Sequence, residues 1–136
     1  MADLLHLQVA TPERELVAVD VAEVQVPGRE GYLGILPGHA ALLGELGTGL
    51  LSYPAGAGRK CMAIQGGFLE VRDDQVRVLA TSAERAEEVN ADHARQTMQE
   101  SQQQLVNPAL GVDPAVALAA IEWAQARLAA AEQSKT

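Results

Sequence analysis

The sequence predicts a β-plus-α protein, with a small β-sandwich or barrel followed by an antiparallel two-helix hairpin. Residues 3–80 are short apolar runs with period-two alternation, separated by glycine and proline turns, a texture typical of small all-β units. After Thr81 there is no glycine until Gly111, and two apolar stripes recur at helical spacing. We therefore expect a β-sandwich domain over residues 1–84 and an α-helical hairpin over residues 85–136.

The first strands follow from strict alternation, which places one face of a strand in the core and the other in water. Residues 5–9 alternate, and residues 17–26 alternate over a longer stretch. Within that stretch, the skip from Val21 to Val24 predicts a bulge or bend. Pro27 and Gly28 then end the strand.

Shorter runs continue the β pattern along the chain. They lie at residues 32–36, 41–43, 49–53, 60–65, 68–72 and 75–80. Asp73 and Asp74 separate two alternating runs and predict a hairpin turn. The segment YPAGAG, residues 53–58, predicts a longer hairpin loop, and Gly66-Gly67 predicts a tight turn between two strands.

Two helices follow, each with its own start signal. Asn90 is suited to cap the first helix, and Asp113-Pro114 to start the second. The apolar face of the first helix is Ala91, Ala94, Met98, Ser101 and Leu105, and that of the second is Ala117, Ile121, Ala124, Leu128 and Ala131. Because these faces are mostly alanine, they bury little apolar area per turn. The hairpin should be marginal on its own and able to detach from the sandwich.

Composition excludes several classes of function. The chain has 10 Lys and Arg against 18 Asp and Glu, a net charge of −8. An acidic chain without a basic patch is a poor binder of nucleic acid or anionic lipid. A single cysteine rules out an internal disulfide and fits a reducing compartment. We see no signal peptide and no apolar run of membrane-spanning length, so any membrane association is expected to be indirect.

No catalytic constellation emerges from the candidate residues. His39 has no partner acid or second ligand nearby in sequence, and Cys61 lies in an apolar strand, where a free cysteine is usually structural. Asp73-Asp74 and Glu87-Glu88 are interpreted as solvated. We therefore expect no enzyme activity, no metal and no cofactor. Trp123 falls outside the second helical stripe, and it either packs on the sandwich or anchors a partner.

Three segments carry a resemblance to a known family. They are GYLGILPGHAALLGEL at residues 31–46, IQGGFLEV at residues 64–71 and AERAEEVNADHAR at residues 83–95. In this order and spacing the chain resembles the epsilon subunit of bacterial F-type ATP synthase along essentially its whole length. The resemblance implies a flattened sandwich of about ten strands and a non-catalytic place in the rotor stalk, between the gamma subunit and the c-ring. It also implies a peripheral location on the cytoplasmic face of the bacterial inner membrane.

The resemblance further implies a regulatory hairpin, which folds onto the sandwich or extends to the catalytic head and impedes ATP hydrolysis. The expected contacts with the c-ring are Glu30, Tyr32, Pro37, Gly38 and His39, and those of the extended hairpin are Trp123 and Arg127. Many members have an acidic residue where this chain has Tyr32, and Glu30 is a candidate substitute.

Some members of the family bind ATP through a motif at the start of the first helix. The corresponding positions here are Val89, Asn90, His93 and Ala94, with Arg95 beside them. The acid of the motif has become Asn90 and its arginine has become His93, which lacks the always-charged fork that suits phosphate. ATP binding is therefore not expected. Two alternatives remain beside the stalk subunit: a stand-alone small-ligand-binding β-sandwich module and, third, an enzyme.

Overall fold

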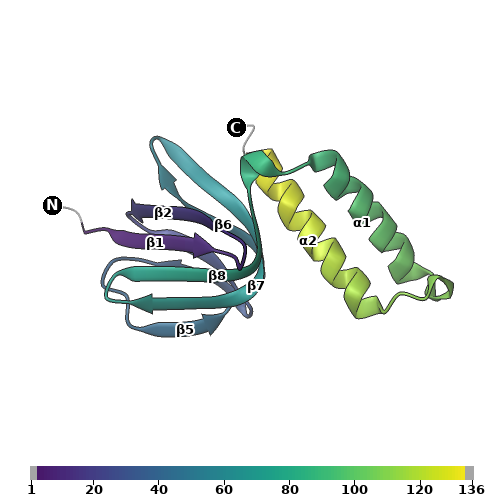
Figure 1. Ribbon diagram of the computed structural model, residues 1–136, viewed down its shortest axis with the longest axis horizontal. Helices are drawn as coiled ribbons and strands as arrows, with labels where there is room; N and C mark the ends of the chain where they lie inside the picture. Colours follow the sequence, from purple (N-terminus) through teal and green to yellow (C-terminus); the bar gives the residue numbers. More distant parts are fainter. Residues whose placement is uncertain (1–2, 134–136) are drawn as a thin grey trace.

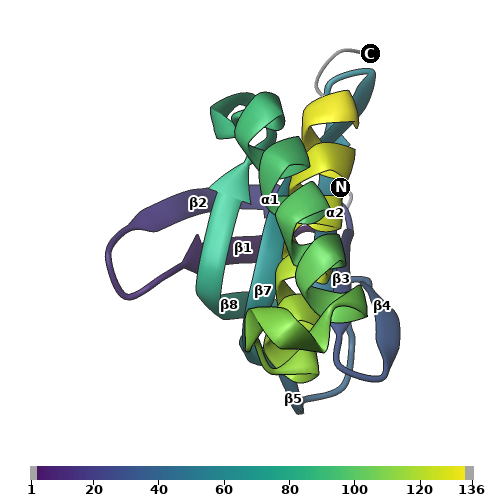
Figure 2. The same cartoon turned by 90° about the vertical axis from the view of Figure 1, so that its right-hand side faces the viewer.

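The computed structural model describes residues 3–133, so residues 1–2 and 134–136, at the outer ends of the two expected units, lie outside the described residues. A β-sandwich is followed by a two-helix hairpin, as expected (Figure 1). The hairpin lies against one side of the sheet, and a view from that side has the helices in front of the strands (Figure 2).

Eight strands make up the sheet of the described residues, rather than about ten. They are β1 (Leu5–Ala10), β2 (Glu15–Val21), β3 (Val24–Gly28), β4 (Gly31–Ile35), β5 (Leu42–Glu45), β6 (Thr48–Ala55), β7 (Gly58–Arg72) and β8 (Gln75–Arg85). The helical elements are η1 (Ala86–Glu88), α1 (Ala91–Val106), η2 (Pro108–Leu110) and α2 (Pro114–Gln133), where η marks a 3₁₀ turn.

The strands form one hydrogen-bonded sheet in the order β2-β1-β8-β7-β6-β3-β4, with β5 also paired to β7. The β1–β8 pair is parallel and the others are antiparallel. The sheet folds over so that inward side chains from its two ends share one core. Its largest fully buried members are Leu5, Leu7, Ile35, Leu51, Ile64, Leu69, Val9, Val24, Val26, Val71, Val76 and Val78.

Two of the turn predictions have different outcomes. Asp73 and Asp74 form the predicted two-residue hairpin turn, with φ of 51° and 59° and Arg72 paired to Gln75. Positive φ at both central residues is the mark of a type I′ turn, which matches the twist of the flanking strands. The predicted longer loop over residues 53–58 is wrong, because β6 and β7 stay paired as far as Ala55 and Gly58.

Residues 17–26 do not form one bent strand. The chain leaves the sheet at residues 22–23, and β2 pairs with β1 while β3 pairs with β4 and β6. Val21 and Val24 are both buried, so the skip in the alternation marks a change of position in the sheet rather than a bulge.

Gly66 and Gly67 lie inside one continuous strand, not in a turn between two. Their φ values are +66° and +107°, and the pairing of β7 with β8 continues on both sides of them. On the other edge of β7 the partner changes here from β6 to β5. The glycines therefore allow β7 to bend where its neighbour changes.

The helix boundaries confirm the capping signals. The Asn90 side chain accepts a hydrogen bond of 3.1 Å from the His93 amide, and that of Asp113 accepts one of 2.8 Å from Ala115. The expected stripe of α2 is buried at Ala117, Ile121, Ala124 and Ala131. Three further residues, Ala126, Arg127 and Ala130, are also buried. This second buried face exists because α2 lies between the sheet and α1 (Figure 1).

Candidate functional site

An exposed surface surrounds the loop between β4 and β5. Leu36 is 61% exposed and Leu43 is 75% exposed, while Glu30 and His39 are exposed polar residues. The Gly38 amide donates a 2.7 Å hydrogen bond to the Asp74 carboxylate, which fixes the loop to the β7–β8 turn. The loop thus presents apolar and polar side chains from a defined backbone, a suitable build for contact with a partner.

Tyr32, expected at the same surface, is also anchored within the protein. Its hydroxyl accepts a 2.9 Å hydrogen bond from the Leu50 amide. A Cβ atom on Gly49 would lie only 2.4 Å from that hydroxyl oxygen, so glycine makes room for the ring across β6. The side chain is still 62% exposed, and a partner could contact its free face.

A groove lies beside this loop, between the β3–β4 hairpin and the end of β5. Its volume is about 530 Å³ and its walls are residues 28–33, 44 and 45. Arg29 donates a 2.5 Å hydrogen bond to Glu45 at its rim.

Within residues 3–133 no group of three or more His, Cys, Asp or Glu side chains could hold a metal ion.

The interface between hairpin and sandwich is built from small side chains. Ala63 of β7, Ala86 of η1, and Ala126 and Ala130 of α2 form one buried cluster. Trp123 packs against this cluster. While the hairpin is docked, this favours a role in packing on the sandwich over a role as an anchor for a partner. Cys61 also packs there, and burial raises the pKa of its thiol, as expected for a structural cysteine rather than a nucleophile.

Arg127 occupies a different place from the one its expected role requires. It is only 8% exposed. Its Nε donates a 2.8 Å hydrogen bond to Glu84 at the end of β8, and its Nη1 lies 3.2 Å from Nδ1 of His93 on α1. While the hairpin is docked, Arg127 therefore bridges three elements and cannot serve as a surface cation for a partner.

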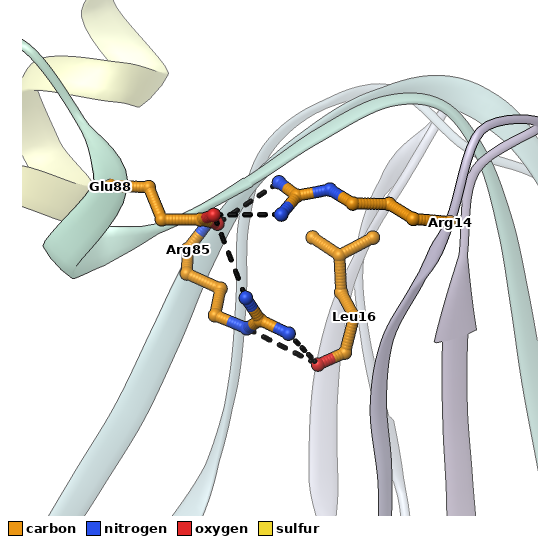
Figure 3. Close-up of polar contacts among 4 residues, drawn as sticks. All are labelled: Arg14, Leu16, Arg85 and Glu88. Atoms are coloured by element: carbon orange, nitrogen blue, oxygen red, sulfur yellow. Dashed lines mark hydrogen bonds and ion pairs between the residues drawn. The ribbon is translucent and has the colours of Figure 1, made fainter.

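The segment that joins the two units is held by a cluster of polar contacts (Figure 3). Two nitrogens of Arg14 donate to the two carboxylate oxygens of Glu88, at 2.7 and 3.0 Å. Arg85 donates its backbone amide to Glu88 at 2.9 Å and its guanidinium to the Leu16 carbonyl at 2.7 and 3.2 Å. The hydrogen bond from Arg14 is the main reason that the pKa of Glu88 is lowered.

This cluster corrects the interpretation of Glu88 as a merely solvated acid. Its partner Arg14 is 74 positions away in sequence, so local pattern could not identify the pair. One contact of Glu88 is local, because its carboxylate accepts the Arg85 backbone amide three residues earlier, as the glutamate of a capping box does.

The residues of the altered ATP motif have structural roles here. Asn90 caps α1, Ala94 is fully buried, and Arg95 pairs with Asp92 at 2.6 Å. Val89 packs against the alanine cluster, and His93 faces Arg127. The structure thus brings His93 close to Arg127 and Glu84, while Arg95 engages a neighbour on its own helix.

No helix within residues 3–133 is long and apolar enough to cross a membrane.

Comparison with known proteins gives a consistent set of relatives. The family described as ATP synthase, Delta/Epsilon chain, beta-sandwich domain matches residues 4–86. An ATP synthase epsilon chain of Solibacter usitatus is 58% identical over 133 residues, covering 98% of this chain and 99% of the relative. One from Koribacter versatilis is 45% identical and covers 77% of this chain and 74% of the relative.

Solved structures share the fold, and one of them does so over nearly the whole chain. A chain in the cryo-EM structure of Euglena gracilis mitochondrial ATP synthase, with OSCP, F1 and c-ring, has a TM-score of 0.74 at 24% identity. The match covers 98% of this chain and 82% of that chain. A chain in the central stalk and c-ring structure of Tetrahymena thermophila mitochondrial ATP synthase has a TM-score of 0.52, at 22% identity over 65% of this chain and 71% of that chain.

Proposed function

The chain belongs to the ATP synthase delta/epsilon chain family, and from this premise we propose that it is the epsilon subunit of an F-type ATP synthase. In this role it is a non-catalytic part of the central stalk, which links the gamma subunit to the c-ring. The observation that carries the proposal is the 58% identity to an epsilon chain over 98% of this chain, hairpin included.

The exposed loop surface around residues 30–43 is the proposed contact with the c-ring. A rigid loop that presents Glu30, Tyr32 and His39 beside Leu36 and Leu43 offers both apolar area and polar groups, as partner surfaces do. Pro37 and Gly38 shape the backbone there. The protein is then peripheral on the cytoplasmic face of the bacterial inner membrane, held through its partners rather than by lipid.

The hairpin is the proposed regulatory part. Docked on the sandwich, it is compatible with ATP hydrolysis, and extended toward the catalytic head, it impedes hydrolysis. Trp123 and Arg127 become available to the head only when α2 leaves the sheet. Residues 114–136 contain two cations, Arg127 and Lys135, which Glu122 and Glu132 balance. Inhibition should therefore be modest and only weakly dependent on salt.

Two experiments test the proposed function. A tagged chain expressed in its own host should co-purify with the gamma and c subunits from detergent-solubilised membranes. Deleting residues 90–136 should raise ATP hydrolysis by the purified complex modestly, and equally at low and high salt. Recovery of the tagged chain without ATP synthase subunits would refute the stalk role and favour the alternative of a stand-alone ligand-binding sandwich. Unchanged hydrolysis after the deletion would refute the regulatory role alone.

A further inference from the structure

We propose that Arg127 is a charge-dependent latch, which holds the hairpin on the sandwich through Glu84, and that the hairpin pivots at Val89–Asn90 when the latch opens. This inference rests on the proposed regulatory role of the hairpin and names the residues that set its resting position.

The latch follows from the burial of one cation in an apolar interface. The Arg127 side chain retains only 10% of its exposure, and Glu84, its partner at 2.8 Å, retains 24%. A buried charge is tolerated only when it is paired and hydrogen-bonded. When the hairpin leaves the sheet, the guanidinium regains water. The docked state therefore requires the Glu84 carboxylate, and the released state does not.

The ion pair matters because the rest of the interface between α2 and the sheet is weak. The residues buried between α2 and the sheet are mainly alanines, among them Ala63, Ala126 and Ala130. Each alanine buries few apolar atoms, so the hydrophobic contribution per turn is small. A single well-placed ion pair can thus decide between docked and released hairpin.

The pivot follows from what is fixed on either side of it. Upstream, Arg14 of the β1–β2 connection and Arg85 at the end of β8 hold Glu88, which fixes η1 to the sandwich (Figure 3). Downstream, α1 begins at Ala91 with Asn90 as its cap. Only Val89 and Asn90 lie between these two fixed parts. A change of backbone conformation at two residues is enough to swing a rigid hairpin away from a rigid sandwich.

The sole tryptophan of the chain reports the state of the latch without labels. Trp123 packs against the alanine cluster when the hairpin is docked. The experiment is acrylamide quenching of Trp123 fluorescence in the isolated full-length chain, for wild type, Glu84→Gln and the control Glu45→Gln. The control removes the carboxylate of an exposed ion pair within the sandwich, Arg29–Glu45.

Glu84→Gln leaves the buried guanidinium without a carboxylate, although His93 still lies beside it, and we expect the docking equilibrium to shift about 10- to 100-fold toward release. Quenching and the emission wavelength of Trp123 should both rise, while the far-UV circular dichroism of the strands is unchanged. Glu45→Gln should behave as wild type. Arg127→Met removes the charge and keeps apolar bulk, leaving Glu84 to be solvated at the rim. It should therefore release the hairpin much less than Glu84→Gln does.

The double variant Glu84→Gln/Arg127→Met completes the test. With neither charge present, the hairpin should dock again and Trp123 should regain its protection. If Glu84→Gln alone disrupts folding, recovery of folding in the double variant supports the latch, because the unpaired cation is then the cause. Wild-type quenching in Glu84→Gln would overturn the proposal, and so would release in Arg127→Met or in the double variant that is as extensive as in Glu84→Gln. A released hairpin without altered ATP hydrolysis by the complex would refute only the proposed regulation.

Discussion

Replacing Gly67 by alanine tests whether the bend of β7 depends on a backbone that only glycine adopts. Gly67 has a φ of +107°, and a Cβ atom there would lie 2.0 Å from the Leu79 carbonyl oxygen and 2.9 Å from the Ala80 Cα. Both neighbours are backbone atoms of β8, the strand paired with β7 at this point. The clash cannot be relieved by turning a side chain, so the sheet itself has to move.

The expected loss of stability combines two contributions. Holding a non-glycine residue in a sparsely populated backbone region costs about 1–3 kcal/mol, and forcing packed atoms apart costs about 1–3 kcal/mol more. The sum, about 2–6 kcal/mol, is a large fraction of the 5–15 kcal/mol that stabilises a typical domain. For a sandwich of this size it corresponds to a decrease in melting temperature of at least about 8 °C.

The assay is urea unfolding followed by far-UV circular dichroism, with Gly44→Ala as the matched control. Gly44 lies in β5 opposite Leu69 of β7, and a Cβ atom there meets nothing within 4 Å. Its free energy of unfolding should stay within about 1 kcal/mol of wild type, since the cost in the folded state is absent. If Gly67→Ala were as stable as Gly44→Ala, the bend of β7 would not depend on glycine.

Two further predictions concern single polar residues. Glu88→Gln should lower the melting temperature at pH 7. Arg14 lowers the pKa of Glu88 in the folded protein, so the carboxylate stabilises the fold fully at any pH above the ordinary glutamate pKa of about 4.3. That advantage is lost as pH falls through the lowered pKa, so melting curves of variant and wild type should converge in acid; a constant difference down to pH 3 would contradict the pairing. His39→Ala should change the free energy of unfolding by less than about 0.5 kcal/mol, because the residue is exposed and its ring hydrogen-bonds to the adjacent Ala40 carbonyl. It should nevertheless weaken co-purification with the c-ring, and intact assembly would remove His39 from the proposed contact surface.

The sequence predicts correctly those turns and helix ends that depend only on neighbouring residues. The Asp73-Asp74 turn, the Asn90 cap and the Pro114 start of α2 each depend on residues within a few positions, and all three are confirmed. The turn predicted at Gly66-Gly67 is wrong, because glycines look alike in a turn and in a strand that bends. The difference depends on the change of partner from β6 to β5, which no local window contains.

The position of Arg127 could not be inferred from spacing, because its partner Glu84 is 43 positions away. A usable signal was present in the composition of α2, which is apolar on almost every side, with Ala126 and Ala130 lying outside the predicted stripe. A helix apolar all round is usually buried on more than one face. That argument would have placed α2 between the sheet and α1, and with it the one arginine of the helix.

The placement of α2 between the sheet and α1 has a consequence for synthesis on the ribosome. Domains generally fold from the N-terminus as the chain emerges, and α1 emerges before α2. Because α1 packs mainly on α2, it has no surface to join until the last 20-residue helix has been made. Until then Ala63 of β7, which α2 covers in the folded protein, stays exposed. A stop codon in the η2 connection would therefore undo the whole hairpin, although it deletes only one of the two helices.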